Sequence, residues 1–264
     1  MATNPHISLV FVNYHSIWQL SLALRQLFHL ESNHDFFEVI VVNNDHREAR
    51  ALARLARKFP IRLLEQERNL GFGRAANIGA ASARGSILGF LNPDTVWQKE
   101  SLRRIESTFQ EHSNGQILGL WLMNAQGERE PFSAGVAPTL WQLVRSNFFP
   151  FLVRQDLLQD APCDWVSGGG LFIEKRIFQE LQGFDERFFL YFEDVDLCLR
   201  AKEQGVLIVS EPRFTLLHHG GKSFVSRELQ KSLFYSSQIR YFEKHRPFFE
   251  VFCVRLFHFF FRHA

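Results

Sequence analysis

The sequence is poor in several features that define common classes of protein. Its three cysteines lie far apart and form no CxxC pair, which argues against disulfide bonds and against a zinc site. The 30 Lys and Arg residues nearly balance the 28 Asp and Glu residues, which leaves a net charge of +2. Without a strong positive balance, no nucleic-acid partner is predicted. Any electrostatic contribution to function is therefore expected to be local.

The first residues also lack the charged segment and the following apolar run that typify a secretory signal. We therefore expect the protein to be cytoplasmic, or to lie peripherally on the cytosolic face of the inner membrane. No internal repeat or low-complexity linker divides the 264 residues. This length suits one α/β domain with a small appendage.

Two glycine-containing segments fall short of nucleotide-binding motifs. Residues 69–79 would match GxGxxG, but Ala76 replaces the third glycine and the segment follows the third predicted strand rather than the first. Residues 221–223 resemble the end of a Walker loop, but Leu216 occupies the position of its first glycine. The segment 69–79 is either an ordinary loop before a helix or a place where the backbone approaches a ligand.

Short apolar runs alternate with helix-like segments through the first half of the sequence. Strands are predicted at 8–13, 37–43, 61–65 and 86–91, and helices at 17–30, 47–58 and 73–84. This order predicts parallel β-α-β units and a sheet covered by helices on both faces. Farther along, we expect a helix at 99–112, strands at 117–123, 171–174 and 214–217, and an irregular segment at 131–162.

Polar residues follow three of these strands. They are Asn13 and Tyr14, then Asn43, Asn44 and Asp45, then Asn92, Pro93 and Asp94. In sheets of this type, ligands bind beyond the carboxyl ends of the strands, so we expect one polar site at that edge. Asp94 suits a divalent cation that bridges a diphosphate, and a turn or helix-cap role is the simpler alternative.

An acidic group follows the aromatic run at 188–192. It consists of Glu193, Asp194 and Asp196. Negative charge is favourable at the start of a helix, which explains the acidity but not the aromatic residues before it. Burial against aromatic rings raises the pKa of a carboxylate, and this suits a general base.

The pair His218–His219 follows the strand predicted at 214–217 and precedes two glycines. Neighbouring side chains on a strand point to opposite faces. We therefore expect only one of the two imidazoles to face a site, where it could bind a metal.

In this order and at these spacings, the segments resemble the inverting family 2 glycosyltransferases of the GT-A fold, most of all the rhamnosyltransferase-like bacterial enzymes. The segments that carry the resemblance are 41–45, 69–77, 91–95, 166–170 and 183–196. The resemblance implies an α/β fold with a Rossmann-like, mostly parallel central sheet flanked by helices. The GT-A domain would span 1–225, with a donor half at 1–98 and an acceptor half at 99–225. A helical, Phe-rich extension would follow at 226–264.

The resemblance further implies a nucleotide-sugar donor, which would be a dTDP-, UDP- or GDP-sugar, with rhamnose as the sugar that the subgroup suggests. The residues implied in donor binding are Asn13, Tyr14, Asp45, Asn69, Gly71, Phe72, Arg74, Asn77, Asn92 and Asp94. Asp94 and His218 would hold Mg²⁺ or Mn²⁺ on the diphosphate. Asn92 replaces the first acidic residue of the family's DxD motif.

For catalysis, Asp194 matches the family's general base, with Glu193 and Asp196 in support. The residues implied at the acceptor or sugar site are Trp165, Gly168, Gly169 and Gly170. The implied reaction is a single displacement that inverts the anomeric carbon, with a glycan or a polyprenyl-linked acceptor. Two alternatives stay open. A nucleotidyltransferase usually has a glycine-rich basic loop after its first strand, which is missing here, and a degenerate scaffold would have lost Asp94 or Asp194.

The segment 246–263 is apolar and aromatic but is interrupted by Glu250, Arg255 and His258. It is too short and too interrupted for a membrane span, which needs about 20 apolar residues. One interpretation is an interfacial helix that makes peripheral contact with a membrane. The other is a helix that packs on the domain or forms a dimer contact.

Overall fold

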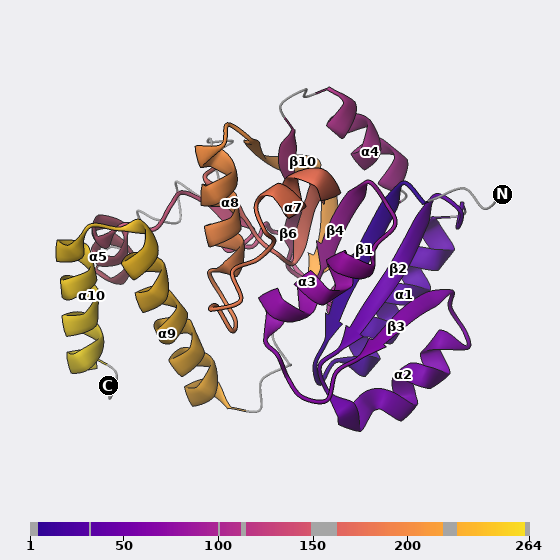
Figure 1. The fold of residues 1–264 in the computed structure, drawn as a ribbon, viewed down its shortest axis with the longest axis horizontal. Helices are drawn as coiled ribbons and strands as arrows, with labels where there is room; N and C mark the ends of the chain where they lie inside the picture. Colours follow the sequence, from indigo (N-terminus) through magenta and orange to yellow (C-terminus); the bar gives the residue numbers. More distant parts are fainter. Residues whose placement is uncertain are drawn as a thin grey trace.

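The computed structural model describes residues 5–31, 33–99, 101–111, 115–148, 163–218 and 226–261. Its centre is an eight-stranded sheet with the order β3-β2-β1-β4-β9-β6-β10-β5, which is flanked by helices (Figure 1). The strands of this sheet are β1 (Ile7–Asn13), β2 (Phe37–Asn43), β3 (Ile61–Glu65), β4 (Ile87–Leu91), β5 (Thr95–Trp97), β6 (Gln116–Met123), β9 (Gly170–Glu174) and β10 (Leu207–His218). Two short strands, β7 (Ala134–Gly135) and β8 (Trp165–Val166), pair separately.

The helices of the described segments follow the predicted alternation in the first half. They are α1 (Ile17–Leu30), the 3-10 turn η1 (His46–Glu48), α2 (Ala49–Ala56), α3 (Phe72–Ser82), α4 (Leu102–Gln110), α5 (Leu140–Phe148), α7 (Lys175–Glu180), α8 (Glu193–Glu203), α9 (Arg227–His245) and α10 (Phe248–Phe261). Within the described ranges, no helix is both long enough and apolar enough to cross a bilayer.

The direction of β9 determines which loops meet. Strands β1 to β4 pair in parallel, as predicted, but β9 runs antiparallel to both β4 and β6. Gly170, the first residue of β9, therefore pairs with Leu91, the last residue of β4. This reversal brings the glycine segment before β9 to the same edge as the polar residues that follow β1, β2 and β4.

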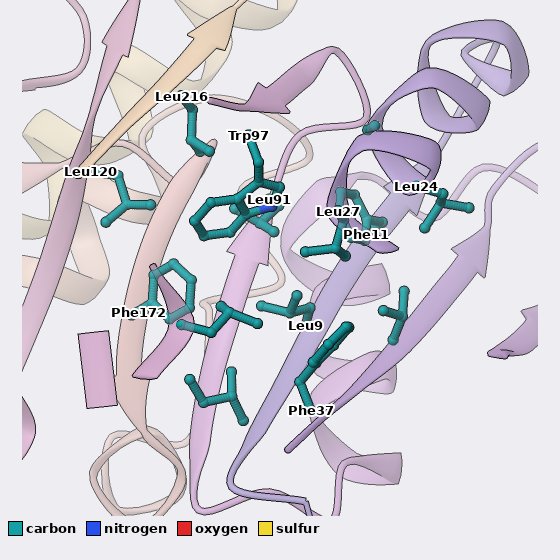
Figure 2. Packing of buried hydrophobic residues seen from close by; sticks show 14 of the residues in the cluster. Leu9, Phe11, Leu24, Leu27, Phe37, Leu91, Trp97, Leu120, Phe172 and Leu216 are labelled. Atoms are coloured by element: carbon teal, nitrogen blue, oxygen red, sulfur yellow. The ribbon is translucent and has the colours of Figure 1, made fainter. Parts of the chain in front are cut away.

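Residues of the inner strands alternate between the two faces of the sheet. On β1, Leu9 and Phe11 point into the core beneath α1, whereas Val10 and Val12 belong to the core beneath α3. Figure 2 shows the first of these cores, where Leu24 and Leu27 of α1 pack against β1. The apolar runs in the sequence are continuous because helices cover both faces of the sheet, as predicted.

A third buried cluster joins the aromatic run to the C-terminal helices. Phe188 and Phe192 pack with Tyr241 and Phe242 of α9 and with Val254 of α10. Figure 1 shows α5, α9 and α10 together at the end of the molecule opposite α2. Residues 226–261 therefore share a hydrophobic core with the preceding domain.

Several elements differ from the sequence predictions, including α7 and the short strands β7 and β8, which were not predicted. Strand β10 begins at Leu207 rather than at 214, because the segment around Glu211 breaks the alternation where the pairing with β6 shifts register. Strand β5, which pairs with the end of β10, was not predicted. Helix α5 lies in the segment predicted to be irregular, and it contacts the distant α10.

Candidate functional site

The polar residues that follow the strands do lie at one edge of the sheet, as predicted. The side chain of Asn13, however, is occupied by hydrogen bonds within the protein. Asn13 and Asn43 are opposite each other in the parallel pairing of β1 and β2. The buried Asn13 amide donates to Asn43 Oδ1 at 3.2 Å and to Glu48 Oε2 at 2.8 Å. Tyr14 follows it and is partly exposed. Asn13 thus positions this edge, and Tyr14 is the neighbour available to a ligand.

Asp45 is also held by protein groups. Its buried carboxylate accepts a hydrogen bond from Arg47 Nε at 2.9 Å and lies 3.0 Å from His15 Nδ1. Burial raises the pKa of Asp45, but the Arg47 hydrogen bonds and the His15 charge outweigh it and hold the pKa below its usual value. Asp45 is therefore an anion at neutral pH, and the exposed Arg47, which was not predicted as a site residue, lies beside it.

The glycine-containing loop before α3 is hydrogen-bonded to the aromatic run at 188–192. Asn69 Oδ1 accepts the Gly71 amide hydrogen at 2.9 Å, and Phe72 N donates to the Phe189 carbonyl at 2.9 Å. Gly71 has φ +83°, and a Cβ atom there would lie 2.3 Å from the Phe189 oxygen. Only glycine meets both conditions without strain. The loop predicted to contact the donor thus supports the segment that leads into the acidic group.

Two predicted donor residues on α3 mainly make contacts within the protein. Asn77 exchanges two hydrogen bonds of 2.9 Å with the backbone of Phe184. Together with Gly183, it lines a cavity that is separate from the one lined by Asp194. Arg74 pairs with Glu186 at 3.3 Å, and both side chains are half exposed. Arg74 remains free to move toward a phosphate, whereas Asn77 fastens α3 to the loop before α8.

A cavity of about 370 Å³ lies where these segments converge. It is lined by Phe72, Asn92, Phe132, Pro138, Leu143, Trp165, Ser167, Gly168, Gly169, Leu190, Tyr191, Phe192, Glu193, Asp194, Val195, Phe234 and Gln238. Apolar and aromatic walls with a few convergent polar groups are typical of a small-molecule site. Phe234 and Gln238 come from α9, so a part of the chain that was predicted to be an extension forms one wall.

The predicted base, Asp194, faces this cavity. It follows two non-glycine residues with left-handed backbone, Tyr191 at φ 69° and Phe192 at φ 68°, a strained conformation that is often found at functional sites. Asp194 Oδ2 accepts from Gly168 N at 2.9 Å, and Oδ1 accepts from Val195 N at 2.8 Å. Burial raises the pKa of Asp194, and these two amide hydrogens limit the rise.

Glycines 168 and 169 give the cavity its space. A Cβ atom on Gly168 would lie 3.2 Å from the Phe72 ring, and one on Gly169 would lie 2.8 Å from Asn92 Nδ2. Trp165 lines the wall and donates through Nε1 to the Val136 carbonyl at 3.0 Å. Gly170 belongs to β9 and is covered by leucines. A side chain at either of the first two glycines would press against Phe72 or Asn92 and reduce the space in front of Asp194.

Asp196 was predicted to support the base, but the structure places it in an ion cluster away from the cavity. It is completely buried and pairs with Arg200 Nε at 2.8 Å, Lys244 Nζ at 2.6 Å and His245 Nε2 at 2.7 Å. Burial raises the pKa of Asp196, but the His245 and Lys244 hydrogen bonds and the nearby cations outweigh it and lower the pKa. Lys244 also pairs with Asp185 at 2.7 Å. Asp196 therefore fastens α9 to α8.

Asp94, two residues after Asn92 in the sequence, lies beside His218, the last residue of β10. His218 Nε2 lies 3.4 Å from Asp94 Oδ2, and His218 Nδ1 lies 2.7 Å from Glu130 Oε2. Burial lowers the pKa of His218, but Asp94 and Glu130 raise it to about 9. Glu130 was not predicted, because it lies in a turn without any motif. His219 lies outside the described residues.

This donor set suits a divalent cation that is shared with a substrate. Within the described segments, no three His, Cys, Asp or Glu side chains cluster as a complete metal cage. Mg²⁺ and Mn²⁺ sites commonly use one or two protein ligands together with phosphate oxygens and water. Asp94 and His218 could supply two ligands, and Glu130 would orient the imidazole. Binding at Nε2 would displace the His218 proton.

Replacing Asp196 with Asn should destabilise the fold strongly, because the substitution leaves the partly buried Arg200 and Lys244 without the anion that they share. We expect a loss of about 3–5 kcal/mol in the free energy of unfolding at pH 7, measured by urea denaturation. Glu186→Gln, at the half-exposed pair with Arg74, is the matched control and should cost less than about 1 kcal/mol.

The same cluster predicts acid sensitivity. The folded pKa values of Asp196 and Asp185 are lowered, so their stabilisation is complete above the unfolded pKa of about 3.9 and is lost as the pH falls toward the folded values. In Asp196→Asn, the dependence of stability on acid pH should be shallower. An unchanged pH dependence would contradict the ion cluster.

The sequence matches a known family model and several characterised proteins. A model described as glycosyl transferase family 2 matches residues 8–181. An N-acetylglucosaminyl-diphospho-decaprenol L-rhamnosyltransferase of Mycobacterium tuberculosis is 30% identical over 208 residues, which are 70% of this chain and 67% of that protein. Rhamnosyltransferase WbbL of Escherichia coli is 28% identical over 194 residues, which are 67% of this chain and 71% of that protein.

Solved structures resemble the fold at low sequence identity. The mannosyltransferase PcManGT from Pyrobaculum calidifontis, in complex with GDP-Man and Mn²⁺, superposes with a TM-score of 0.65 and 15% identity over 92% of this chain and 64% of that one. GalNAc-T7 with UDP, GalNAc and Mn²⁺ gives a TM-score of 0.67 and 15% identity over 92% of this chain and 48% of that one. The likeness to these two structures concerns the fold alone.

Proposed function

Since the chain belongs to glycosyl transferase family 2 and has the GT-A fold, we propose that it is an inverting enzyme that moves rhamnose from a nucleoside-diphosphate donor to a lipid-linked glycan. The donor would be a dTDP-, UDP- or GDP-sugar. The M. tuberculosis relative is named for rhamnosyl transfer to a decaprenyl-diphosphate-linked N-acetylglucosamine, which supports both the sugar and the acceptor class. The alternatives of a nucleotidyltransferase and of a scaffold without activity are set aside.

The observation that carries this proposal is the position of Asp194 in the cavity. Its two oxygens are fixed by the amides of Gly168 and Val195, so the carboxylate is oriented without a side-chain partner among the residues that the structure describes. In the proposed step, Asp194 accepts the proton of an acceptor hydroxyl as the oxygen bonds to the anomeric carbon. The bond between that carbon and the diphosphate breaks on the opposite face, and the nucleoside diphosphate leaves with the electron pair.

The residues proposed to hold the leaving group lie beyond Asn92. Asp94 and His218 would bind the divalent cation, Mg²⁺ or Mn²⁺, and Glu130 would keep the imidazole in place through its 2.7 Å contact with Nδ1. A cation bound there would neutralise charge that develops on the diphosphate. Tyr14 and the Asp45–Arg47 pair would meet the nucleoside at the adjoining strand ends.

We also propose that the end of the molecule formed by α5 and α10 contacts a membrane. Its aromatic surface consists of Trp141, Val144, Phe248, Phe249, Phe252 and Leu256, of which Phe248 is 83% exposed. Phe248, Phe252 and Leu256 are spaced by four residues and so share one face of α10, while Val251 and Val254 on the other face are buried. The cavity is lined by Leu143 of the same α5, so a lipid-linked acceptor could enter from a bilayer held at this surface.

Asp194→Asn should lower turnover by roughly 10²–10⁴ while donor binding survives, because only the proton acceptor is lost. Transfer from dTDP-, UDP- and GDP-sugars to an N-acetylglucosaminyl-diphosphoryl lipid is the measurement. Asp164→Asn, outside the cavity, serves as the matched control. Turnover near that of the wild type in Asp194→Asn would remove this residue from the base role.

Asp94→Ala and His218→Ala should each weaken the Mn²⁺-dependent binding of a nucleoside diphosphate by at least about tenfold, and Glu130→Gln should weaken it by about tenfold through its effect on the imidazole. Calorimetry with and without Mn²⁺ gives these affinities. If the wild type binds the nucleotide equally well without the cation, the metal assignment fails.

The double variant Phe248→Ser/Phe252→Ser should float with anionic liposomes less than the wild type does, because insertion depends on buried apolar area. Trp18→Ser is the control, since Trp18 is 73% exposed but lies on α1, outside the aromatic surface. Recovery of the wild type in the soluble fraction, or a stable dimer in sedimentation that the double variant abolishes, would contradict the membrane contact.

A further inference from the structure

Glu193 is the first residue of α8 and lies in the cavity wall next to the proposed base. It is only 5% exposed, and its aliphatic part faces α3, where a Cβ atom on Gly73 would lie 3.6 Å from Glu193 Cβ. Its Oε2 atom has no hydrogen-bond partner among the described residues. A buried polar atom without a partner is rare in folded proteins and indicates that something absent from the structure completes the site.

The environments of the two adjacent carboxyl groups differ. Asp194 receives amide hydrogens from Gly168 and Val195, which stabilise its anion. For Glu193, burial and the nearby charge of Asp194 raise the pKa well above its usual value, and only its own backbone amide opposes the rise. No Lys, Arg or His is described as a partner of Glu193. An unpaired buried anion beside a second anion is costly, so the proton stays on Glu193.

We propose that Glu193 is a neutral hydrogen-bond donor to a hydroxyl of the acceptor sugar other than the reacting one. This inference rests on the proposed function and assigns the recognition of the acceptor to the same turn of α8 that carries the base. Adjacent carboxyl groups whose environments separate their protonation states commonly divide their roles in this way. Glu193 is therefore a specificity residue rather than a second base.

A neutral donor has two consequences for the reaction. It adds no second negative charge beside Asp194, so the base ionises more readily than it would next to a second carboxylate. It also makes binding depend on a particular hydroxyl, because a buried donor that loses its partner costs a factor of about 10–100 in affinity or rate.

The experiment compares Glu193→Gln and Glu193→Ala. Glutamine keeps a neutral hydrogen-bond donor in nearly the same volume, so kcat/KM should stay within about threefold of the wild type, whereas alanine should lower it by about 10–100-fold. The substrates are the nucleotide sugar that the panel of dTDP-, UDP- and GDP-sugars identifies as the donor, and N-acetylglucosaminyl-diphosphoryl lipid with its 3-, 4- and 6-deoxy forms. The wild type should lose about 10–100-fold on one deoxy form that still reacts, and Glu193→Ala should not distinguish that form from the parent.

A Glu193→Gln variant as inactive as Asp194→Asn would overturn the inference, because it would mean that an ionised Glu193 is required. Unchanged discrimination among the deoxy acceptors in Glu193→Ala would overturn it too, since the contribution would then be structural. A second readout needs no turnover: the infrared difference between wild type and Glu193→Gln at pH 7 should contain the carbonyl band of a protonated carboxylic acid. Carboxylate bands alone would refute the neutral donor. A wild type that transfers no sugar while showing the acid band would instead refute the proposed function.

Discussion

Three acidic side chains lie within the first turn of α8, and the groups that surround the carboxyl group differ from one to the next. Asp196 is surrounded by Arg200, Lys244 and His245. Asp194 receives two backbone amide hydrogens. Glu193 has one oxygen without any partner. Because buried charge must be compensated or neutralised, these three arrangements fit a structural anchor at Asp196, the proposed base at Asp194 and the proposed neutral donor at Glu193.

The ion pairs that compensate the charge of Asp196 also explain how the helices around the cavity are arranged. Two of its partners, Lys244 and His245, belong to α9, so the ion cluster forms only when α9 docks against α8. Docking places Phe234 and Gln238 in the cavity wall and buries Tyr241 and Phe242. On α10, Val251 and Val254 complete the third hydrophobic cluster, whereas Phe248, Phe249 and Phe252 remain exposed. The wall of the proposed acceptor site and the proposed membrane surface are thus parts of the same helical unit.

The family, the fold class and the alternation of strands and helices up to β4 were predicted from the sequence and are confirmed. Periodicity identified β1, β2 and α1 to within a residue, because each packs on both sides or presents one apolar stripe. The roles of single residues were harder to predict. The sequence placed Asp196 beside Asp194 at a helix start, but side chains two positions apart on a helix point in different directions. Two of the three partners of Asp196, Lys244 and His245, lie on α9, far away in the sequence. Glu130 and the direction of β9 likewise depend on long-range pairing. The roles predicted for Asp94, Asp194 and His218 remain predictions, which the geometry supports.

In the proposed mechanism, Asp194 and the Asp94–His218 pair are the two sides of one reaction centre. A crystal structure of the protein with Mn²⁺ and the nucleoside diphosphate of its donor tests this most directly, because anomalous diffraction locates the metal independently of any assay. We expect a metal peak bonded to the Asp94 carboxylate and to His218 Nε2, with the diphosphate on the side of the cavity away from Asp194. A metal bound at Asp194, or a diphosphate bound away from Asp94, would contradict it.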